Sequence, residues 1–199
     1  MTLTSAGLSE PVLTEDPWSL PNRITLARTL GALALGAAAS AHHSLRLLAV
    51  AYAVYWVGDM LDGFVARRTA SETRQGAVLD IVCDRASCGL LAGVFLAMTP
   101  DAAPAISLYL LQFMVVDCVL SLGFLHWPIL SPNHFGQVDR RLYLWNWSPA
   151  AKVVNTAGLV LVVAAGAYQL AVVLAALQLA VKAASLVALA RLLTGRRPA

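Results

Sequence analysis

Charged residues are scarce in this chain. Aspartate, glutamate, lysine and arginine make up only 13% of its 199 residues, whereas 59% are hydrophobic and the mean hydropathy is +0.70. About a quarter of the residues of a typical soluble domain are charged, so this composition excludes an ordinary soluble protein and indicates an integral membrane protein. The net charge is only +3, and we expect no nucleic-acid partner.

Cysteine is rare as well, and the alternation of polar and apolar residues that predicts β-strands is missing. The three cysteines, Cys83, Cys88 and Cys118, all lie in apolar stretches. Their spacing fits neither a disulfide framework nor a zinc site, so we interpret them as small packing residues. Because open sheets cannot cross lipid, we expect helices to span the membrane.

Long apolar runs are what the sequence does contain. They cover residues 24–41, 47–66, 77–98, 103–125 and 149–191. The last run is too long for one span of about 20 residues and right for two, with a turn at 166–169. The predicted fold class is therefore an all-α integral membrane protein with six transmembrane helices.

The polar stretches between and around these runs set the organisation of the chain. Residues 1–20 are polar and broken by prolines, so we expect a flexible or interfacial segment there. The six helices form one domain over residues 21–193, with a long polar loop at 128–148 and a basic tail at 194–199. We interpret His126 and His134 as loop residues.

The distribution of lysine and arginine predicts the orientation of the chain. Of its fourteen basic residues, only Arg46 lies at the end where odd helices finish and even helices begin, and Lys182 lies within the last helix. Basic residues gather on the cytoplasmic side of membrane proteins. We therefore expect a multi-pass protein of the cell (inner) membrane with both termini in the cytoplasm. A basic cytoplasmic surface also suits anionic membrane lipids.

Four carboxylates interrupt the second and third apolar runs. We refer to Asp59, Asp62, Asp80 and Asp84 as the acid cluster. The first two residues are three apart and the last two are four apart, so each pair lies on one face of a helix. A short connector makes the two helices antiparallel neighbours, which brings the pairs together at the cytoplasmic end. Charges in membrane helices are costly and indicate function. Hard oxygen ligands suit Mg²⁺ or Mn²⁺, and we expect two ions.

Small residues and one arginine accompany the acid cluster. Gly63 lets a ligand approach the backbone, and Ala66 keeps the same helix face open one turn later. Arg67 supplies a forked donor suited to phosphate, and Gly76 opens the next helix. Metal ligands, an arginine and small residues together indicate a substrate that carries a pyrophosphate.

These residues resemble the signature of the CDP-alcohol phosphotransferases, also called CDP-alcohol phosphatidyltransferases. The pattern has eight fixed positions at fixed spacing: Asp59, Asp62, Gly63, Ala66, Arg67, Gly76, Asp80 and Asp84. The resemblance extends to the six-helix layout. It implies a homodimer with its active site at the cytoplasmic interface, which moves the phosphatidyl group of CDP-diacylglycerol to a small polar alcohol and releases CMP.

The resemblance also implies roles for these positions. Asp59, Asp62 and Asp80 would hold metal, while Asp84 would approach a second ion and act as the general base. The remaining positions would line the CDP pocket: Gly63, Ala66, Arg67 and Gly76.

A second polar motif opens the first helix. Asn22, Thr25 and Arg28 share one face at its cytoplasmic end. This start resembles that of phosphatidylglycerophosphate synthases and predicts contact with the nucleotide or diphosphate. The alternative is a helix cap with an arginine that reaches toward the interface.

Weaker signals concern the acceptor alcohol. The resemblance suggests that Lys152, with Asn155, helps to bind a phosphorylated acceptor; the alternative is an anchor at the membrane interface. Lys182 either lines the acceptor pocket or forms a buried pair with Asp117. The aromatic residues after Arg140 and Arg141 indicate an interfacial belt, with an acceptor gate as the alternative.

The acceptor itself is the least determined part of the prediction. The central stretch resembles phosphatidylinositol phosphate synthases, whereas the start of the first helix and Lys152 resemble phosphatidylglycerophosphate synthases. Residues 117–125 carry no lysine or arginine, unlike either group. We favour glycerol 3-phosphate, with inositol phosphate next. A cation transporter or a non-catalytic lipid-binding protein is the alternative class, although transporters place their acids nearer the bilayer midplane.

Overall fold

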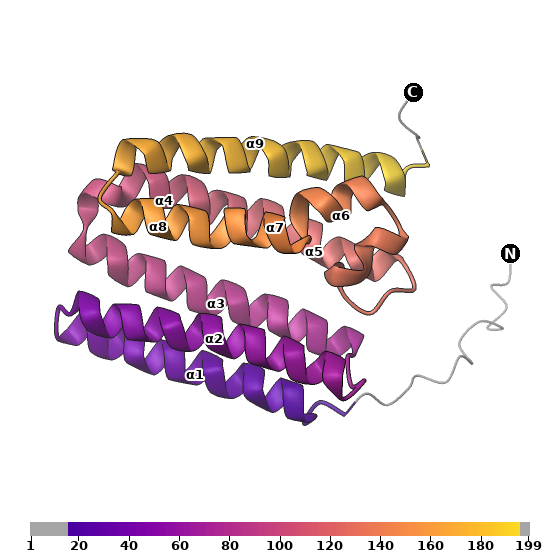
Figure 1. Cartoon of the computed structure of the whole chain (residues 1–199), viewed down its shortest axis with the longest axis horizontal. Coiled ribbons are helices and arrows are strands. Elements are labelled where there is room, and N and C mark those ends of the chain that lie inside the picture. The colour runs from indigo at the N-terminus through magenta and orange to yellow at the C-terminus, as the bar shows by residue number, and fades with distance from the viewer. Residues whose placement is uncertain (1–15, 196–199) are drawn as a thin grey trace, which may run out of the picture.

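The computed structural model describes residues 16–195 (Figure 1). Residues 1–15, which form most of the predicted N-terminal segment, and residues 196–199 of the predicted basic tail lie outside this range. The described part is helical and contains no strand. It has six helical segments that are long and apolar enough to cross a membrane, which confirms the predicted fold class: Leu20–Ala41, Leu45–Arg68, Arg74–Met98, Pro100–His126, Arg140–Ala164 and Tyr168–Leu193.

The first three segments are continuous helices with local start signals. Helix α1 (Leu20–Ala41) has proline in its first turn. Helix α2 (Leu45–Arg68) is capped by Ser44, whose side chain accepts a hydrogen bond from the Leu47 amide. Helix α3 (Arg74–Met98) is capped in the same way by Thr73. The short connector at 69–73 makes α2 and α3 antiparallel, as predicted.

The fourth segment changes its helical type along its length. A 3-10 turn η1 (Pro100–Ala102) leads into α4 (Ala103–Leu110), a π-helical stretch η2 (Leu111–Asp117), α5 (Cys118–Leu122) and a 3-10 turn η3 (Gly123–His126). The π-helical stretch ends at Asp117. π-Helical turns widen the helix locally and often occur at functional sites.

The predicted polar loop at 128–148 is largely helical, so its description as a loop was wrong. This stretch contains a 3-10 helix η4 (Pro132–Gln137) and helix α6 (Arg140–Asn146), which Asp139 caps through the Leu142 amide at 2.8 Å. Apolar residues among the polar ones anchor it: Phe135 is fully buried and stacks on Trp147, with ring centroids 4.6 Å apart. Trp147 is therefore a core residue and not part of an interfacial belt.

Two smaller predictions, the loop position of two histidines and the place of the last turn, need correction. His126 and His134 lie in the 3-10 helices η3 and η4, not in irregular loops. The last turn covers residues 165–167, since α9 (Tyr168–Leu193) already begins at Tyr168. Gly166 adopts a φ of +72° in this turn, a conformation that glycine accepts without strain. Three elements precede this turn in the chain: α7 (Pro149–Val153), a π-helical stretch η5 (Val154–Gly158) and α8 (Leu159–Ala164).

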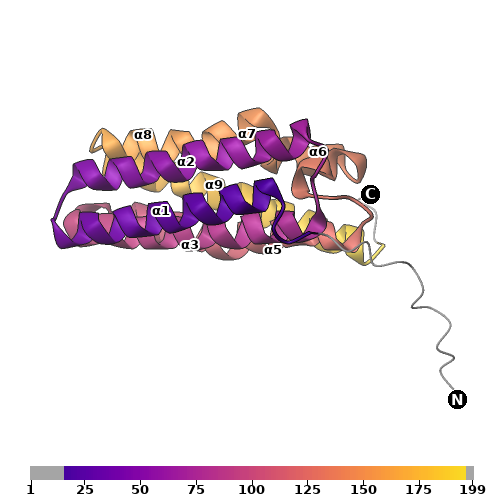
Figure 2. The same ribbon diagram turned by 90° about the horizontal axis from the view of Figure 1, so that it is seen from below.

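The helices lie side by side along one long axis in two groups (Figures 1 and 2). Helices α1, α2 and α3 form one group, and α4, α8 and α9 lie beyond α3. The core of residues 16–195 consists of three buried apolar clusters, and that of the first group centres on Ala32, Ala51 and Leu91. Many large apolar side chains face outward, as lipid contact requires. The connector between α2 and α3, helix α6 and the C-terminal end of α9 lie at the same end of the molecule.

Candidate active site

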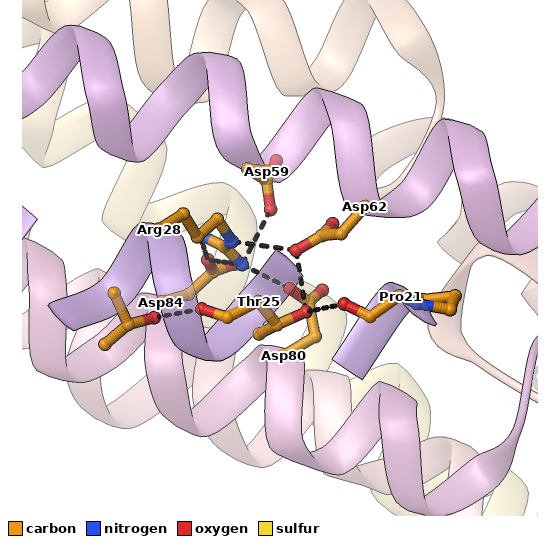
Figure 3. Close-up of polar contacts among 8 residues, drawn as sticks. Pro21, Thr25, Arg28, Asp59, Asp62, Asp80 and Asp84 are labelled. Carbon is orange, nitrogen blue, oxygen red and sulfur yellow. Dashed lines mark hydrogen bonds and ion pairs between the residues drawn. The ribbon is translucent and has the colours of Figure 1, made fainter. Parts of the chain in front are cut away.

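The four carboxylates of the acid cluster converge at this end of the molecule. Helix α2 carries Asp59 and Asp62 in its C-terminal half, and α3 carries Asp80 and Asp84 near its start. Figure 3 shows all four side chains turned toward a common centre. One carboxylate oxygen from each of Asp59, Asp62 and Asp80 lies within 4.8 Å of the others.

Arg28 of helix α1 occupies the centre of the acid cluster (Figure 3). Its Nε donates to Asp62 Oδ2 at 2.8 Å, and both Nη1 and Nη2 donate to Asp84 Oδ1 at 3.0 Å. Nη2 also contacts Asp80 and lies 3.3 Å from Asp59 Oδ1. One guanidinium therefore contacts every member of the cluster. The sequence predicted that Arg28 contacts the substrate or reaches toward the interface. Arg28 is buried among the metal-ligand candidates, so the second alternative is wrong and the first stays a prediction.

Thr25 and Asn22 complete the contribution of α1. The Thr25 hydroxyl donates to Asp62 Oδ2 at 2.7 Å, so this buried carboxylate is held by two residues of α1. Asn22 donates to the Pro17 carbonyl at 3.2 Å and lies beside Gly76. A Cβ on Gly76 would lie only 2.8 Å from Asn22 Oδ1, so the glycine makes room for α1 as well as for any ligand.

One cavity of about 450 Å³ joins the sequence-predicted residues. Its lining contains every one of them except Arg28, whose side chain is buried beside the acid cluster. The predicted residues in the lining are Asn22, Thr25, Asp59, Asp62, Gly63, Ala66, Arg67, Gly76, Asp80, Asp84, Lys152, Asn155 and Lys182. A Cβ on Gly63 would lie 3.1 Å from Arg67 Nη1, so the Arg67 guanidinium lies over Gly63.

The acid cluster fits a divalent cation. Mg²⁺ binds oxygens at about 2.0–2.1 Å, so two of its ligands lie at most about 4.2 Å apart. The three oxygens lie within 4.8 Å of one another, so small side-chain rotations would bring them to one ion. The side chains of Asp59 and Asp80 are 35% and 39% exposed and line the cavity, so an ion can reach them from that side. Carboxylates are the hard ligands that Mg²⁺ and Mn²⁺ prefer.

Lys182 and Asp117 form the buried pair that was one of the two predictions for them. The Lys182 ammonium donates to Asp117 Oδ1 at 2.5 Å. Arg85 Nη2 donates to Asp117 Oδ2 at 2.6 Å, and its guanidinium lies over the Phe113 ring at 3.9 Å. All four side chains also line the cavity. Sequence reasoning missed Arg85, although its position directly after Asp84 was a usable signal.

A second group that the sequence did not reveal lies at the cavity rim. Glu72, in the connector between α2 and α3, accepts a hydrogen bond from the Ser131 hydroxyl at 2.7 Å and pairs with His134 Nε2 at 3.0 Å. Burial raises the pKa of Glu72, but hydrogen bonds from His134 and Ser131 outweigh it and hold that pKa below its ordinary value. The Lys152 ammonium donates to Asn133 Oδ1 at 2.7 Å. These contacts fix the start of η4 beside the site.

Comparisons with known proteins identify the family. No curated protein and no solved structure matches the chain. A sequence model of one family does match, over residues 18–189, a range that includes all six membrane segments except the end of the last. That family is the one whose signature the acid cluster resembles. The chain therefore belongs to the CDP-alcohol phosphatidyltransferase family.

Proposed function

We propose that this enzyme moves the phosphatidyl group of CDP-diacylglycerol to the hydroxyl of a small polar alcohol. One observation carries the proposal: a single cavity at one end of the membrane helices contains the acid cluster, the small residues Gly63 and Gly76, and Arg67. This inventory suits a pyrophosphate between a lipid and a nucleotide. The end of the helix bundle also suits a reaction between a lipid and a water-soluble alcohol.

The chemistry is a phosphoryl-type displacement. The acceptor oxygen forms a bond to the phosphorus that carries diacylglycerol, and the bond from that phosphorus to the bridging oxygen breaks. The electron pair of the broken bond stays on the departing CMP, and the acceptor proton passes to a base. A divalent ion, when bound to the acid cluster, would neutralise the charge on the diphosphate. We expect Arg67, which lines the same cavity, to add donors to the same group.

Asp84 is our choice for the base. Its side chain is 19% exposed and lines the cavity one helical turn from Asp80. A base must lie within hydrogen-bond reach of the hydroxyl that it deprotonates. We expect the acceptor to bind between Asp84 and Lys152, which line the same cavity, with its hydroxyl toward Asp84.

We propose glycerol 3-phosphate as the acceptor, with inositol phosphate as the second candidate. Lys152 is exposed and lines the cavity, and among the described residues its hydrogen-bond partner is the uncharged Asn133, so its charge is available to a phosphate. The charge of Lys182, in contrast, is already shared with Asp117. We also expect a homodimer in the cell membrane, on the family resemblance alone.

The test is CMP release by the purified protein from CDP-diacylglycerol with added Mg²⁺. We expect release that depends on the ion and on one acceptor from a panel of glycerol 3-phosphate, inositol phosphate and their unphosphorylated alcohols. Asp84→Asn should abolish transfer while the folded protein still binds CDP-diacylglycerol. Asp101→Asn, an exposed acid in η1 outside the cavity lining, is the matched control. Normal turnover by the Asp84 variant would remove Asp84 as the base.

A further inference from the structure

The contacts of Arg28 go beyond what a substrate-binding arginine requires. Its Nη2 atom alone contacts Asp59 from α2 and both Asp80 and Asp84 from α3. One nitrogen therefore bridges the two helices that carry the acid cluster. A divalent ion shared by α2 and α3 would need carboxylates of the same residues.

The position of Arg28 is supported by several neighbours. Its side chain is only 2% exposed. Gly58 of α2 leaves the space for its stem, because a Cβ there would lie 2.5 Å from the Arg28 Cβ. The Tyr55 ring centroid lies 5.5 Å from the guanidinium carbon, within the range of a cation–π contact. Since a buried charge is tolerated only when it is paired, Arg28 belongs to the acid cluster as a structural partner.

Charge favours competition between this guanidinium and a metal ion. Two cations at the same carboxylates would repel each other at short range in a weakly screened site. Without any cation, four carboxylates from neighbouring helices would repel one another in the same way. Arg28 removes part of that repulsion, and a divalent ion would remove it more completely.

We propose that Arg28 is an internal counter-ion that competes with the divalent cation for the acid cluster. It neutralises the carboxylates before metal binds and yields its contacts with the acid cluster when an ion is bound there. The inference rests on the metal-dependent function proposed above. A guanidinium released in this way is a forked donor suited to a diphosphate, which agrees with the sequence prediction that Arg28 contacts the substrate.

The two possible roles of Arg28, competition with the ion and positioning of the carboxylates, predict opposite changes in metal affinity when Arg28 is replaced. If Arg28 competes, Arg28→Gln should bind a divalent ion more tightly than the unaltered protein. If Arg28 only holds the carboxylates in place for the ion, the same change should weaken metal binding. The two outcomes can be separated without any activity measurement.

The experiment is a titration of the purified full-length protein in lipid nanodiscs with Mn²⁺, in which the electron paramagnetic resonance signal reports free Mn²⁺. No CDP-lipid is added. We expect Arg28→Gln to bind Mn²⁺ about ten-fold more tightly or better, because a charge in contact with the site is removed. Arg23→Gln removes the same charge from an exposed position on the same helix and is the matched control. Its Mn²⁺ affinity should stay within about two-fold of the unaltered protein, since exposed charges are screened.

Thermal unfolding gives a second readout. With EDTA, Arg28→Gln should unfold at a lower temperature than the unaltered protein. Mn²⁺ should raise its unfolding temperature again, because a ligand of the folded state stabilises that state. If Arg28→Gln does not fold even with Mn²⁺, Arg28→Lys takes its place, since one ammonium cannot make all five contacts of the fork. It keeps the charge but makes fewer contacts with the carboxylates, so it should bind Mn²⁺ more tightly than the unaltered protein, by less than the ten-fold expected when the charge is removed.

The outcomes distinguish the inference from the function on which it rests. Equal or weaker Mn²⁺ binding by the Arg28 variants, with clear binding by the unaltered protein, overturns the counter-ion role alone. Absence of Mn²⁺ binding in all variants overturns both the counter-ion role and the proposed metal dependence.

Discussion

At the scale of single residues, the site depends on the space that Gly58 leaves for Arg28. A Cβ at position 58 would lie 2.5 Å from the Arg28 Cβ and 2.8 Å from its Cδ, both closer than side-chain atoms approach. The stem of Arg28 cannot move away freely, because its guanidinium is bound to carboxylates of two other helices. The absence of a side chain at Gly58 thus allows α1 to deliver a charge to the acid cluster.

Gly58→Ala should therefore destabilise the protein. We expect a loss of about 1–3 kcal/mol in the free energy of unfolding, the usual cost of forcing extra atoms into a packed site. CMP release should fall as well, because the displaced arginine disturbs the carboxylates. Chemical unfolding in detergent and the CMP assay measure the two effects.

Gly93→Ala is the matched control for this substitution. Gly93 also lies in a membrane helix, but a Cβ there meets no atom within 4 Å. We expect no loss of stability or activity. Equal effects of the two substitutions would show that helix composition, and not the contact with Arg28, determines the cost.

Sequence alone predicted the acid cluster because its residues follow helical spacing within apolar surroundings. Asp59 and Asp62 on one helix and Asp80 and Asp84 on the next, with a short connector, leave little freedom for their arrangement. The place of Arg28 was not predictable, because it depends on how α1 packs across α2 and α3. No spacing rule relates a residue of the first helix to acids that are 31 to 56 positions away.

At the scale of elements, Asp117 connects three membrane segments. It belongs to η2 and binds Arg85 of α3 and Lys182 of α9. Both cations are buried, so neither can recover its interaction from water. This group joins α3, which carries half of the acid cluster, to the second group of helices.

Asp117→Asn should cost about 3–5 kcal/mol in the free energy of unfolding, the range found when one partner of a buried ion pair is removed. The cost arises because two buried cations lose their counter-charge. The measurement is reversible chemical unfolding in detergent. A companion variant replaces all three residues by apolar ones: Arg85→Met, Asp117→Leu and Lys182→Met.

The triple variant should be more stable than Asp117→Asn, because no charge is then left unpaired. If Asp117→Asn is as stable as the unaltered protein, the three segments are not held by this charge group.

The helices themselves were largely predictable, and the exceptions have physical causes. Apolar length sets the membrane spans, so six were expected and six are present among the described residues. Helix α6 was missed because Arg140, Arg141 and the surrounding polar residues hide its few buried side chains, such as Leu142. The π-helical stretches were missed because local widening of a helix has no composition signal.

At the scale of the whole molecule, the two ends of the helix bundle differ in charge. The end with the acid cluster also contains the connector 69–73, with Arg67, Arg68 and Arg74 beside it. The other end has the connections between α1 and α2 and between α8 and α9 (Figure 1). Among the described residues, Arg46 is the one lysine or arginine near those two connections. The asymmetry of basic residues predicts that the site faces the cytoplasm.

Single cysteines at the two ends test this orientation. His42→Cys and Ala165→Cys lie in exposed connections at one end, and Thr69→Cys lies in the connector at the other. In intact cells, a membrane-impermeant maleimide should label the first two variants and should label Thr69→Cys only after the membrane is opened. The unaltered protein is the control, because Cys83 and Cys88 are buried and Cys118 is half-buried. The reverse labelling pattern would place the acid cluster outside, away from the nucleotide-activated lipid and phosphorylated acceptor that the proposed reaction needs.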